Sequence, residues 1–304
     1  MILHHYDLSP FSEKIRLMLD YSGLGWRSAI SPAMPPRPIV DPLAGGYRRI
    51  PVAQIGADIF CDTRVISSEI AKLTGKAELA MENCVPEVQE FVRHMDSQVF
   101  MAIPLVSSPL RTMAALFSAF TPFQAMRFIK DRAHIATSMQ MKRVSRASAQ
   151  KLLLEADKDV EARLSEYDFM FGDKPCIADF SSYHLTWFRL TMQGEAFLSG
   201  LANTKKWIAR MAALGNVDRS EIGKEQVFQE ARDAQPRKIP SSMKQNSLIG
   251  KSVEIKPTDY AQDSVLGTLV GADTLRWVVA RESDQLGIVH VHFPTADFKM
   301  AAVR

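Results

Sequence analysis

The alternation of strand and helix patterns over the first 75 residues constrains the fold more than any other feature of this sequence. Residues 2–6 form a short apolar stretch typical of a strand, and helical periodicity follows as far as Gly23, a residue type that commonly ends helices. Further strands are predicted over 26–30, 52–55 and 58–61, and a further helix over 62–73. A proline-rich irregular segment separates the two halves of this pattern, which predicts a small α/β domain.

Three short segments lie at junctions between these predicted elements. Ser9 precedes Pro10 at the start of the first helix, Pro51 precedes the strand at 52–55, and Asp62 opens the second helix. Each has an ordinary structural explanation, because Ser and Asp are common N-caps and proline suits an edge strand. The start of a helix also carries unpaired N–H groups and a partial positive charge, which stabilise an anion. The sequence alone leaves both explanations open.

The middle of the chain, residues 85–235, is predicted to be helical throughout. Residues 177–192 are far more apolar than the rest and are expected at the centre of this region, whereas 219–234 has the pattern of a surface helix. Cys176 and Asp179 precede and open the central segment with the spacing of a capping box.

The last part of the chain changes its hydrophobic period. After a linker at 235–250, four short strands separated by turn residues are predicted over 252–256, 265–270, 276–281 and 288–293. Residues 245–304 are therefore predicted to form a small antiparallel β module, β-barrel-like and suited by its short strands to an SH3-like arrangement. A module of about 60 residues buries little surface alone, so we expect it to dock on the helical body.

Composition argues against several classes of function. The chain has 37 basic and 34 acidic residues, a balance that does not favour a nucleic acid partner. It has no apolar run long enough to span a membrane and no signal-peptide pattern, so no membrane association is expected. Its three cysteines follow no disulfide or metal spacing, which favours a reducing, cytoplasmic location.

Two histidines near the end of the chain, His290 and His292, share one face of a predicted strand. Such a pair is a candidate for metal binding. A solvated strand face is the simpler interpretation, and no metal site is predicted.

Three segments match, in order and spacing, the ligand-binding segments of a known family: Ser9-Pro10-Phe11, Ile50-Pro51 and Asp62-Thr63. They resemble the thioredoxin-like glutathione-binding domain of the glutathione S-transferases. The capping box at Cys176 and Asp179 is similar to one in the second domain of that family. The resemblance implies a thioredoxin-like α/β domain over 1–76 and an all-α domain over 85–235. The β module over 245–304 lies outside the usual two-domain pattern.

The resemblance also implies roles around the sulfur and the peptide backbone of glutathione. Ser9 would be the catalytic residue that stabilises the thiolate, with Ser12 as its local competitor. Phe11 belongs to the implied glutathione-binding set. Ile50, placed before a cis Pro51, would pair its backbone with the cysteinyl unit.

The two ends of glutathione would be held by other residues. By resemblance, the Asp62 carboxylate faces the γ-glutamyl ammonium, and the Thr63 hydroxyl faces the α-carboxylate. Arg49 would reach the glycyl carboxylate, with Arg48 and Arg37 as competitors from the preceding irregular segment.

Residues 95–128 are rich in methionine and phenylalanine, a composition that suits either a helix core or an adaptable apolar cleft. The first long helices after the linker face the sulfur in the family, so Arg93, His94 and Phe100 are candidates for a second-substrate pocket. The resemblance thus implies a glutathione transferase whose thiolate attacks a small apolar electrophile by substitution or addition, with isomerase activity as a variant.

Partners follow from the same resemblance. Glutathione is the implied co-substrate, and family precedent suggests a homodimer, with no nucleic acid and no membrane. The alternative is a non-catalytic adaptor, since several members of the superfamily use the fold to bind glutathione or proteins. In that case the module at 245–304 is a candidate for recruiting a partner protein.

Overall fold

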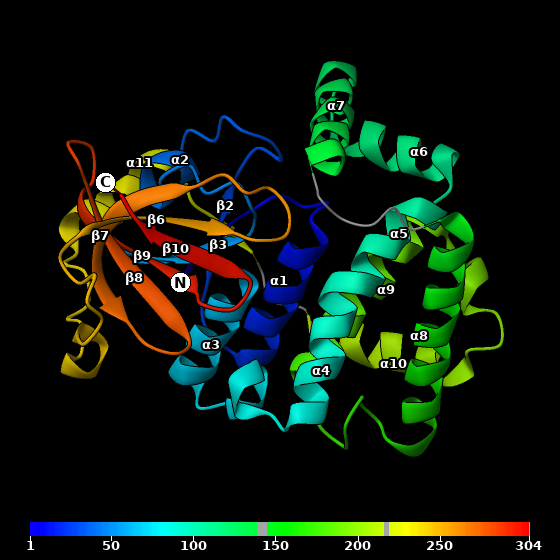
Figure 1. Ribbon diagram of the computed structural model, residues 1–304. Coiled ribbons are helices and arrows are strands. Elements are labelled where there is room, and N and C mark those ends of the chain that lie inside the picture. Colours follow the sequence, from blue (N-terminus) through cyan, green and yellow to red (C-terminus); the bar gives the residue numbers. More distant parts are fainter. Residues whose placement is uncertain (139–144, 216–218, 304) are drawn as a thin grey trace.

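The computed structural model describes residues 1–138, 145–215 and 219–303. In Figure 1 the strands gather on one side of the molecule and the helices between residues 86 and 212 on the other, with α1 (Pro10–Ser22) between them. The predicted fold class is confirmed: a thioredoxin-like domain is followed by a helical domain and an antiparallel β module.

The first domain contains β1 (Ile2–His5), α1, β2 (Arg27–Ile30), α2 (Val40–Ala44), β3 (Val52–Ile55), β4 (Asp58–Cys61) and α3 (Thr63–Thr74). β1 runs parallel to β2 and antiparallel to β3, and β3 runs antiparallel to β4. The short helix α2 lies inside the segment that the sequence predicted to be irregular. The other elements match their predicted positions.

Local sequence explains where α1 begins and ends. Ser9 has an extended backbone, and its Oγ accepts a hydrogen bond of 3.2 Å from the Ser12 N–H, so it caps the helix. Pro10 follows at the first helical position, where a missing N–H costs nothing. Gly23 ends the helix with φ of 73°, a conformation that glycine adopts without a Cβ clash.

The helical domain contains α4 (Pro86–His94), α5 (Phe100–Val106), α6 (Pro109–Ala119), α7 (Pro122–Ser138), α8 (Arg146–Glu166), α9 (Ile177–Gln193) and α10 (Ala202–Ala212). A π-helical turn over Met95–Val99 joins α4 to α5. No single helix among the described residues is long and apolar enough to cross a membrane. Within the described part of the chain, only the stretch 86–106 taken with α6 reaches that length and composition, and the two are bent by 103°.

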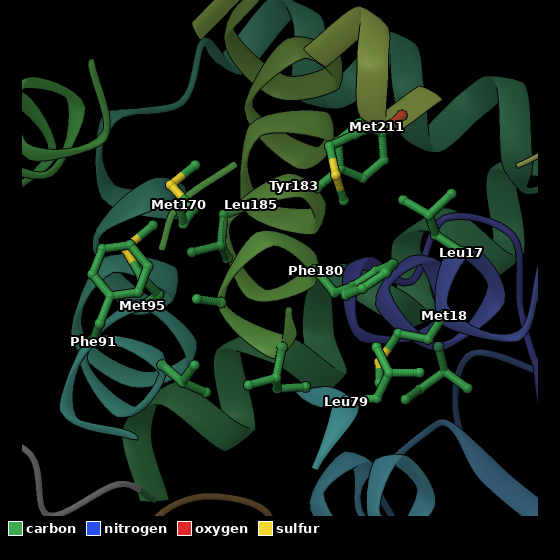
Figure 2. Packing of buried hydrophobic residues seen from close by; sticks show 14 of the residues in the cluster. Leu17, Met18, Leu79, Phe91, Met95, Met170, Phe180, Tyr183, Leu185 and Met211 are labelled. Carbon is green, nitrogen blue, oxygen red and sulfur yellow. The ribbon is translucent and has the colours of Figure 1, made fainter. Parts of the chain in front are cut away.

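α9 is the central helix, as predicted, and its capping box is confirmed. Asp179 accepts hydrogen bonds from the backbone N–H groups of Cys176 at 3.0 Å and Met170 at 2.9 Å. In Figure 2 this helix carries Phe180 toward Met18 of α1, and Leu185 toward the opposite side. The first two domains therefore share one apolar core, in which each buried side chain contributes roughly 1.5–3 kcal/mol.

Residues 219–234 differ from the predicted surface helix. Ser220–Glu221 form a short strand, β5, which pairs in parallel with β2, and the helix α11 begins only at Lys224 and ends at Asp233. Val227 and Phe228 on α11 are buried in a second apolar core. The predicted surface helix is confirmed over Lys224–Asp233, where most side chains are exposed. Its predicted start was wrong, because the pairing of Ser220–Glu221 with β2 joins segments far apart in the sequence.

The C-terminal module consists of β6 (Ser252–Pro257), β7 (Val265–Ala272), β8 (Arg276–Ser283), β9 (Gly287–Pro294) and β10 (Phe298–Ala302). β9 pairs in parallel with β4, so the two domains form one sheet in the order β10-β6-β7-β8-β9-β4-β3-β1-β2-β5. Docking on the helical body was the wrong expectation, because the unpaired edge of β4 offers backbone hydrogen bonds. β9 and β10 stand at opposite ends of the module's strand order and are not paired with each other. An SH3-like barrel is not shown.

A buried polar network crosses the junction between β4 and the module. His292 Nε2 lies 2.8 Å from Asp58 Oδ1, and the Arg237 backbone N–H donates to the other carboxylate oxygen at 3.0 Å. Arg237 also pairs with Glu69, which is fully buried and lies 3.7 Å from Arg276. The solvated face expected for His292 is therefore wrong: the side chain is buried at the seam between β4 and β9.

Candidate active site at the junction of the three domains

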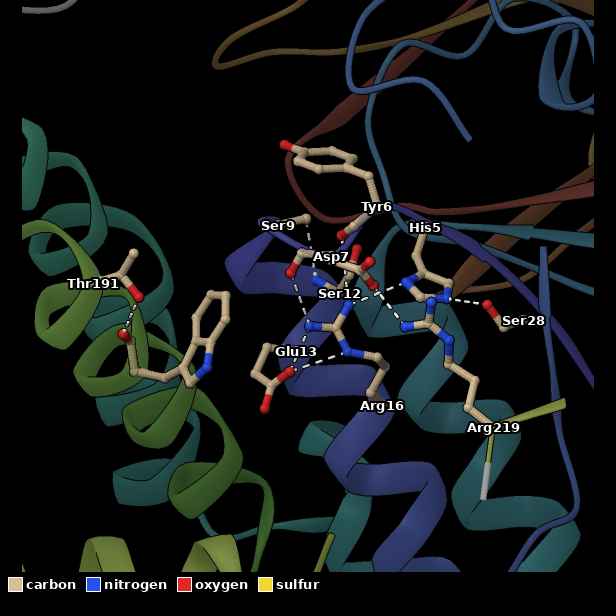
Figure 3. Close-up of polar contacts among 11 residues, drawn as sticks. His5, Tyr6, Asp7, Ser9, Ser12, Glu13, Arg16, Ser28, Thr191 and Arg219 are labelled. Atoms are coloured by element: carbon tan, nitrogen blue, oxygen red, sulfur yellow. Dashed lines mark hydrogen bonds and ion pairs between the residues drawn. The ribbon is translucent and has the colours of Figure 1, made fainter. Parts of the chain in front are cut away.

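The turn between β1 and α1 holds Ser9 at the start of the helix. Ser9 Oγ accepts its bond from the Ser12 N–H and donates none among the described residues, so its proton is available to a ligand. Arg16 fixes the turn: it donates to the Asp7 carbonyl oxygen at 3.1 Å and to Glu13 at 2.5 Å. Figure 3 shows these contacts converging beneath Ser9.

His5 completes this arrangement from β1. Because a guanidinium can only donate, His5 Nδ1 accepts from Arg16 at 3.1 Å, and Nε2 then donates to Ser28 Oγ at 2.9 Å. Burial, followed by the charge of Arg16, lowers the pKa of His5 to about 3, so the ring is neutral. The imidazole is thus a structural support for the turn.

A small cavity of about 90 Å³ lies where the first domain meets the C-terminal module. It is lined by all six residues for which the family resemblance implied glutathione binding: Phe11, Arg49, Ile50, Pro51, Asp62 and Thr63. The Ile50–Pro51 peptide is cis, as expected, and the Ile50 backbone forms no hydrogen bond within the described residues. The volume is well below the roughly 300–1,000 Å³ of typical ligand pockets.

Asp62, in the wall of the small cavity, has unusual backbone dihedral angles. Its φ of 82° and ψ of 142° lie outside the regions favoured by residues with a Cβ. One carboxylate oxygen accepts a hydrogen bond of 3.0 Å from the Arg64 N–H and caps α3. The capping function expected from sequence and a position on the cavity wall therefore coincide in one residue.

Arg49 is already engaged by the C-terminal module. Its Nη2 donates to the Asp259 carboxylate and to the Tyr260 carbonyl oxygen, and its guanidinium lies 4.0 Å from the centroid of the Tyr260 ring. Its Nε is buried and has no partner among the described residues. The residue expected to bind a ligand carboxylate thus has a carboxylate of its own chain in that place.

A larger cavity of about 550 Å³ adjoins the small one and has the volume of an ordinary ligand pocket. The two share Phe11, Arg49, Ile50 and Tyr260 as a common wall. Ser9 lines the larger cavity. The remaining wall is largely apolar and comes from α5, α6, α7 and α9, with Phe100, Met101, Leu116, Phe128, Phe188 and Met192 among its residues.

The candidate residues divide between the two cavities. Arg93 lines the small cavity and Phe100 the large one, whereas Ser12 and His94 line neither. Arg37 lines only the large cavity. It donates to the carbonyl oxygens of Pro32 and Ala33, and burial lowers its pKa to about 10.

Sequence reasoning missed the wall residues that come from the C-terminal module: Asp259, Tyr260, Ala296, Asp297 and Phe298. Phe298 begins a strand, β10, that the alternation pattern did not predict, and the other four lie in turns. Nothing in the local sequence of a turn signals which distant surface it covers.

A largely buried cluster of charged and polar side chains contributes to the wall of the small cavity. Asp96, in the π-helical turn, lies 2.6 Å from Lys14 Nζ and 3.1 Å from His184 Nε2. Burial would raise the pKa of Asp96, but Lys14 and His184 outweigh it and hold the value at about 2. π-helical turns often mark functional sites, and here the turn directs a carboxylate toward both a domain interface and the cavity wall.

The described residues contain no group of three or more His, Cys, Asp or Glu side chains that could hold a metal ion. All three cysteines are free thiols. Burial raises the pKa of Cys61 and of Cys176, so neither thiol is an activated nucleophile.

Comparison with known proteins identifies the family. Residues 3–77 match the family profile described as the glutathione S-transferase N-terminal domain, and residues 108–214 match the glutathione S-transferase C-terminal domain. The chain belongs to the glutathione S-transferase superfamily. A search of curated proteins found no match.

Two solved structures are similar to this glutathione S-transferase-like chain. It is similar to a GST-like protein from Pseudomonas syringae, with 27% identity, a TM-score of 0.77, and coverage of 99% of this chain and 98% of that chain. That likeness includes the C-terminal strands. A glutathione S-transferase from Rhodospirillum rubrum F11 shares the fold, with 16% identity, a TM-score of 0.50, and coverage of 70% and 87% respectively.

Proposed function

We propose that this glutathione S-transferase-like protein binds glutathione along Ile50, Asp62 and Thr63 and directs its sulfur toward Ser9. The proposal is carried by one observation: residues from three distant segments converge on two cavities with a common wall. The unpaired Ile50 backbone suits the cysteinyl unit bound as an added strand. The Asp62 carboxylate suits an ammonium group, and Thr63 at the start of α3 suits a carboxylate.

The chemistry follows from the acidity of the thiol. A thiol with a pKa near 8.5 is only ~3% ionised at pH 7, and the thiolate is the nucleophile. The Ser9 hydroxyl and the start of α1 stabilise the anion by hydrogen bonding and helix charge. A shift of ~2.5 units requires about 3.4 kcal/mol of preferential stabilisation of the thiolate.

Ser9 also restricts the type of reaction. A serine forms no mixed disulfide with glutathione, so conjugation is favoured over thiol reduction. The thiolate forms a bond to an electrophilic carbon, the leaving group departs with the electron pair of its bond, and the thiol proton passes to solvent. The apolar cavity of about 550 Å³ suits the body of that electrophile. A cytoplasmic homodimer is part of the same proposal.

Replacement of Ser9 tests the assignment. Ser9→Ala is expected to lower kcat for a nitro-activated aryl chloride by about ten-fold or more while glutathione binding is retained, because a donor to the developing thiolate is lost. Ser9→Thr keeps a hydroxyl and should retain more of the rate. Ser12→Ala is the matched control, since Ser12 Oγ is buried away from both cavities. An unchanged rate in Ser9→Ala would move the chemistry to another group.

A non-catalytic adaptor is the second candidate, and two observations favour it. The small cavity is tight, and Arg49 is already paired with Asp259. An adaptor would bind glutathione or a partner protein but turn over no electrophile as the wild-type chain. Measured turnover that depends on Ser9 would exclude it.

A further inference from the structure

Two loops of the C-terminal module close over the small cavity. The first, residues 258–264, joins β6 to β7, and the second, residues 295–297, joins β9 to β10. Each loop contributes an aspartate to the cavity wall, Asp259 from the first and Asp297 from the second. The module therefore contributes to the binding site as well as extending the sheet.

Both aspartates pair with arginines of the thioredoxin-like domain. Asp259 accepts from Arg49, and Asp297 lies 2.6 Å from Arg64 Nη2. Arg49 is the group expected to meet the glycyl carboxylate of glutathione, and Arg64 stands at the start of α3, where the γ-glutamyl carboxylate is expected. The carboxylates of Asp259 and Asp297 thus lie beside the two positions expected for the glycyl and γ-glutamyl carboxylates of a bound glutathione.

The two loops are tied to each other. Thr258 donates its backbone N–H and its hydroxyl to the Asp297 carbonyl oxygen, at 2.9 Å and 3.1 Å. Ala261 in the first loop and Asp297 in the second have positive φ values of 47° and 61°. Such backbones persist where the surroundings hold them in place. Release of one loop therefore loosens the other.

The contacts that hold the loops are not deeply buried. The side chains of Asp259 and Asp297 are 44% and 60% exposed, whereas those of Arg49 and Arg64 are 10% and 27% exposed. The carboxylate of each pair is therefore open to solvent, and ion pairs with such an exposed partner are weakened by solvent screening. A ligand with two carboxylates would therefore be able to displace them. Its arrival would also supply a partner for the buried Nε of Arg49.

We propose that Asp259 and Asp297 are built-in substitutes for the two carboxylates of glutathione and keep the site closed until the tripeptide displaces them. This inference rests on the proposed function, because it concerns the same site. It accounts for the small volume, about 90 Å³, of a cavity lined by the whole expected set of glutathione-binding residues. The module then regulates access to the thiol site.

The test is a gain of affinity, which misfolding would not produce. Asp259→Asn, Asp297→Asn and the double variant of the full chain are titrated with glutathione by calorimetry. The double variant is expected to bind about ten-fold more tightly than wild type, because the arginines lose their internal competitors. Asp284→Asn, on the exposed turn between β8 and β9, removes the same charge away from both cavities and should leave the affinity unchanged.

A second ligand makes the test specific to the carboxylate. Glutathione esterified at its glycyl carboxylate should show no gain with Asp259→Asn, because it has no carboxylate to compete for Arg49. Equal affinity of wild type and variants for glutathione, or an equal gain for the ester, would overturn the inference and leave the proposed function intact. If neither wild type nor any variant bound glutathione at millimolar concentration, both would fail.

Discussion

At the scale of single residues, Asp62 shows how a binding role and a stability cost coincide. Its backbone lies in a region that favours glycine, yet the chain keeps a carboxylate there. Such conformations cost about 1–3 kcal/mol and cluster at functional sites. The sequence predicted the cap that Asp62 provides for α3, but it gave no sign of the unusual backbone, which depends on how β4 enters the helix.

Asp62→Gly is therefore expected to stabilise the fold while it weakens glutathione binding. Glycine relieves the strained backbone, and as an N-cap it costs only a few tenths of a kcal/mol relative to aspartate, so unfolding should require about 1 kcal/mol more. Asp62→Ala keeps the strain and loses the cap, so it should lose about 1 kcal/mol. Urea unfolding and calorimetry measure both effects, and equal stability of the two variants would contradict the argument.

At the scale of elements, the seam between β4 and β9 decides how the C-terminal module is held. The strands pair in parallel, and the carboxylates of Asp58 and Glu69 lie buried beside them with cationic or imidazole partners. Buried charges without partners are costly, so each carboxylate requires the groups that the module and its linker supply. The network therefore favours one position of the module on β4, in which every buried carboxylate has its partner.

Glu69→Ala is expected to destabilise the protein by about 3 kcal/mol, because Arg237 and Arg276 lose their common buried partner. Glu69→Gln should lose less, since the amide still accepts a hydrogen bond. Urea unfolding measures the change. Glu155→Ala is the matched control: its carboxylate is 60% exposed in an ion pair with Lys151, and its loss should change stability by about 0.5 kcal/mol or less. A similar effect in both variants would show that the seam is unimportant.

The elements also show what sequence could and could not predict. Ser9, Gly23 and Asp179 act through neighbours a few residues away, so the limits of α1 and the capping box of α9 were predictable. The pairing of β4 with β9 joins segments more than 200 residues apart, and no local pattern specifies such a partner. The residues expected around glutathione lie within one short domain and could be grouped from its motifs. Asp259 and Asp297 reach the same cavity from about 200 residues further along the chain, so they were missed.

At the scale of the whole molecule, buried histidines make stability depend on pH. Burial lowers the pKa of all five histidines for which a shift is found, His4, His5, His184, His290 and His292. They span both domains and the seam with the module. Because the unfolded chain binds these protons near pH 6.5 and the folded chain does not, lowering the pH favours unfolding.

The free energy of unfolding should therefore fall as the pH drops from about 6.5 toward 4. For His4, whose pKa burial lowers to about 4, the loss approaches about 3 kcal/mol across that window. Urea unfolding at a series of pH values measures the slope. His4→Gln keeps a polar side chain next to Gln54 and should flatten the curve. A stability that stays constant between pH 7 and 5 would contradict the argument.

The single continuous sheet has a consequence for synthesis on the ribosome. Strand β4 emerges early, but its partner β9 is translated only after some 230 further residues, as the separation of 234 between Asp58 and His292 indicates. At ~5–20 residues per second, that interval lasts roughly 10–50 s. During this time the nascent N-terminal domain exposes an open strand edge, so chaperone occupancy during translation should matter more for this chain than for a superfamily member without the extra strands.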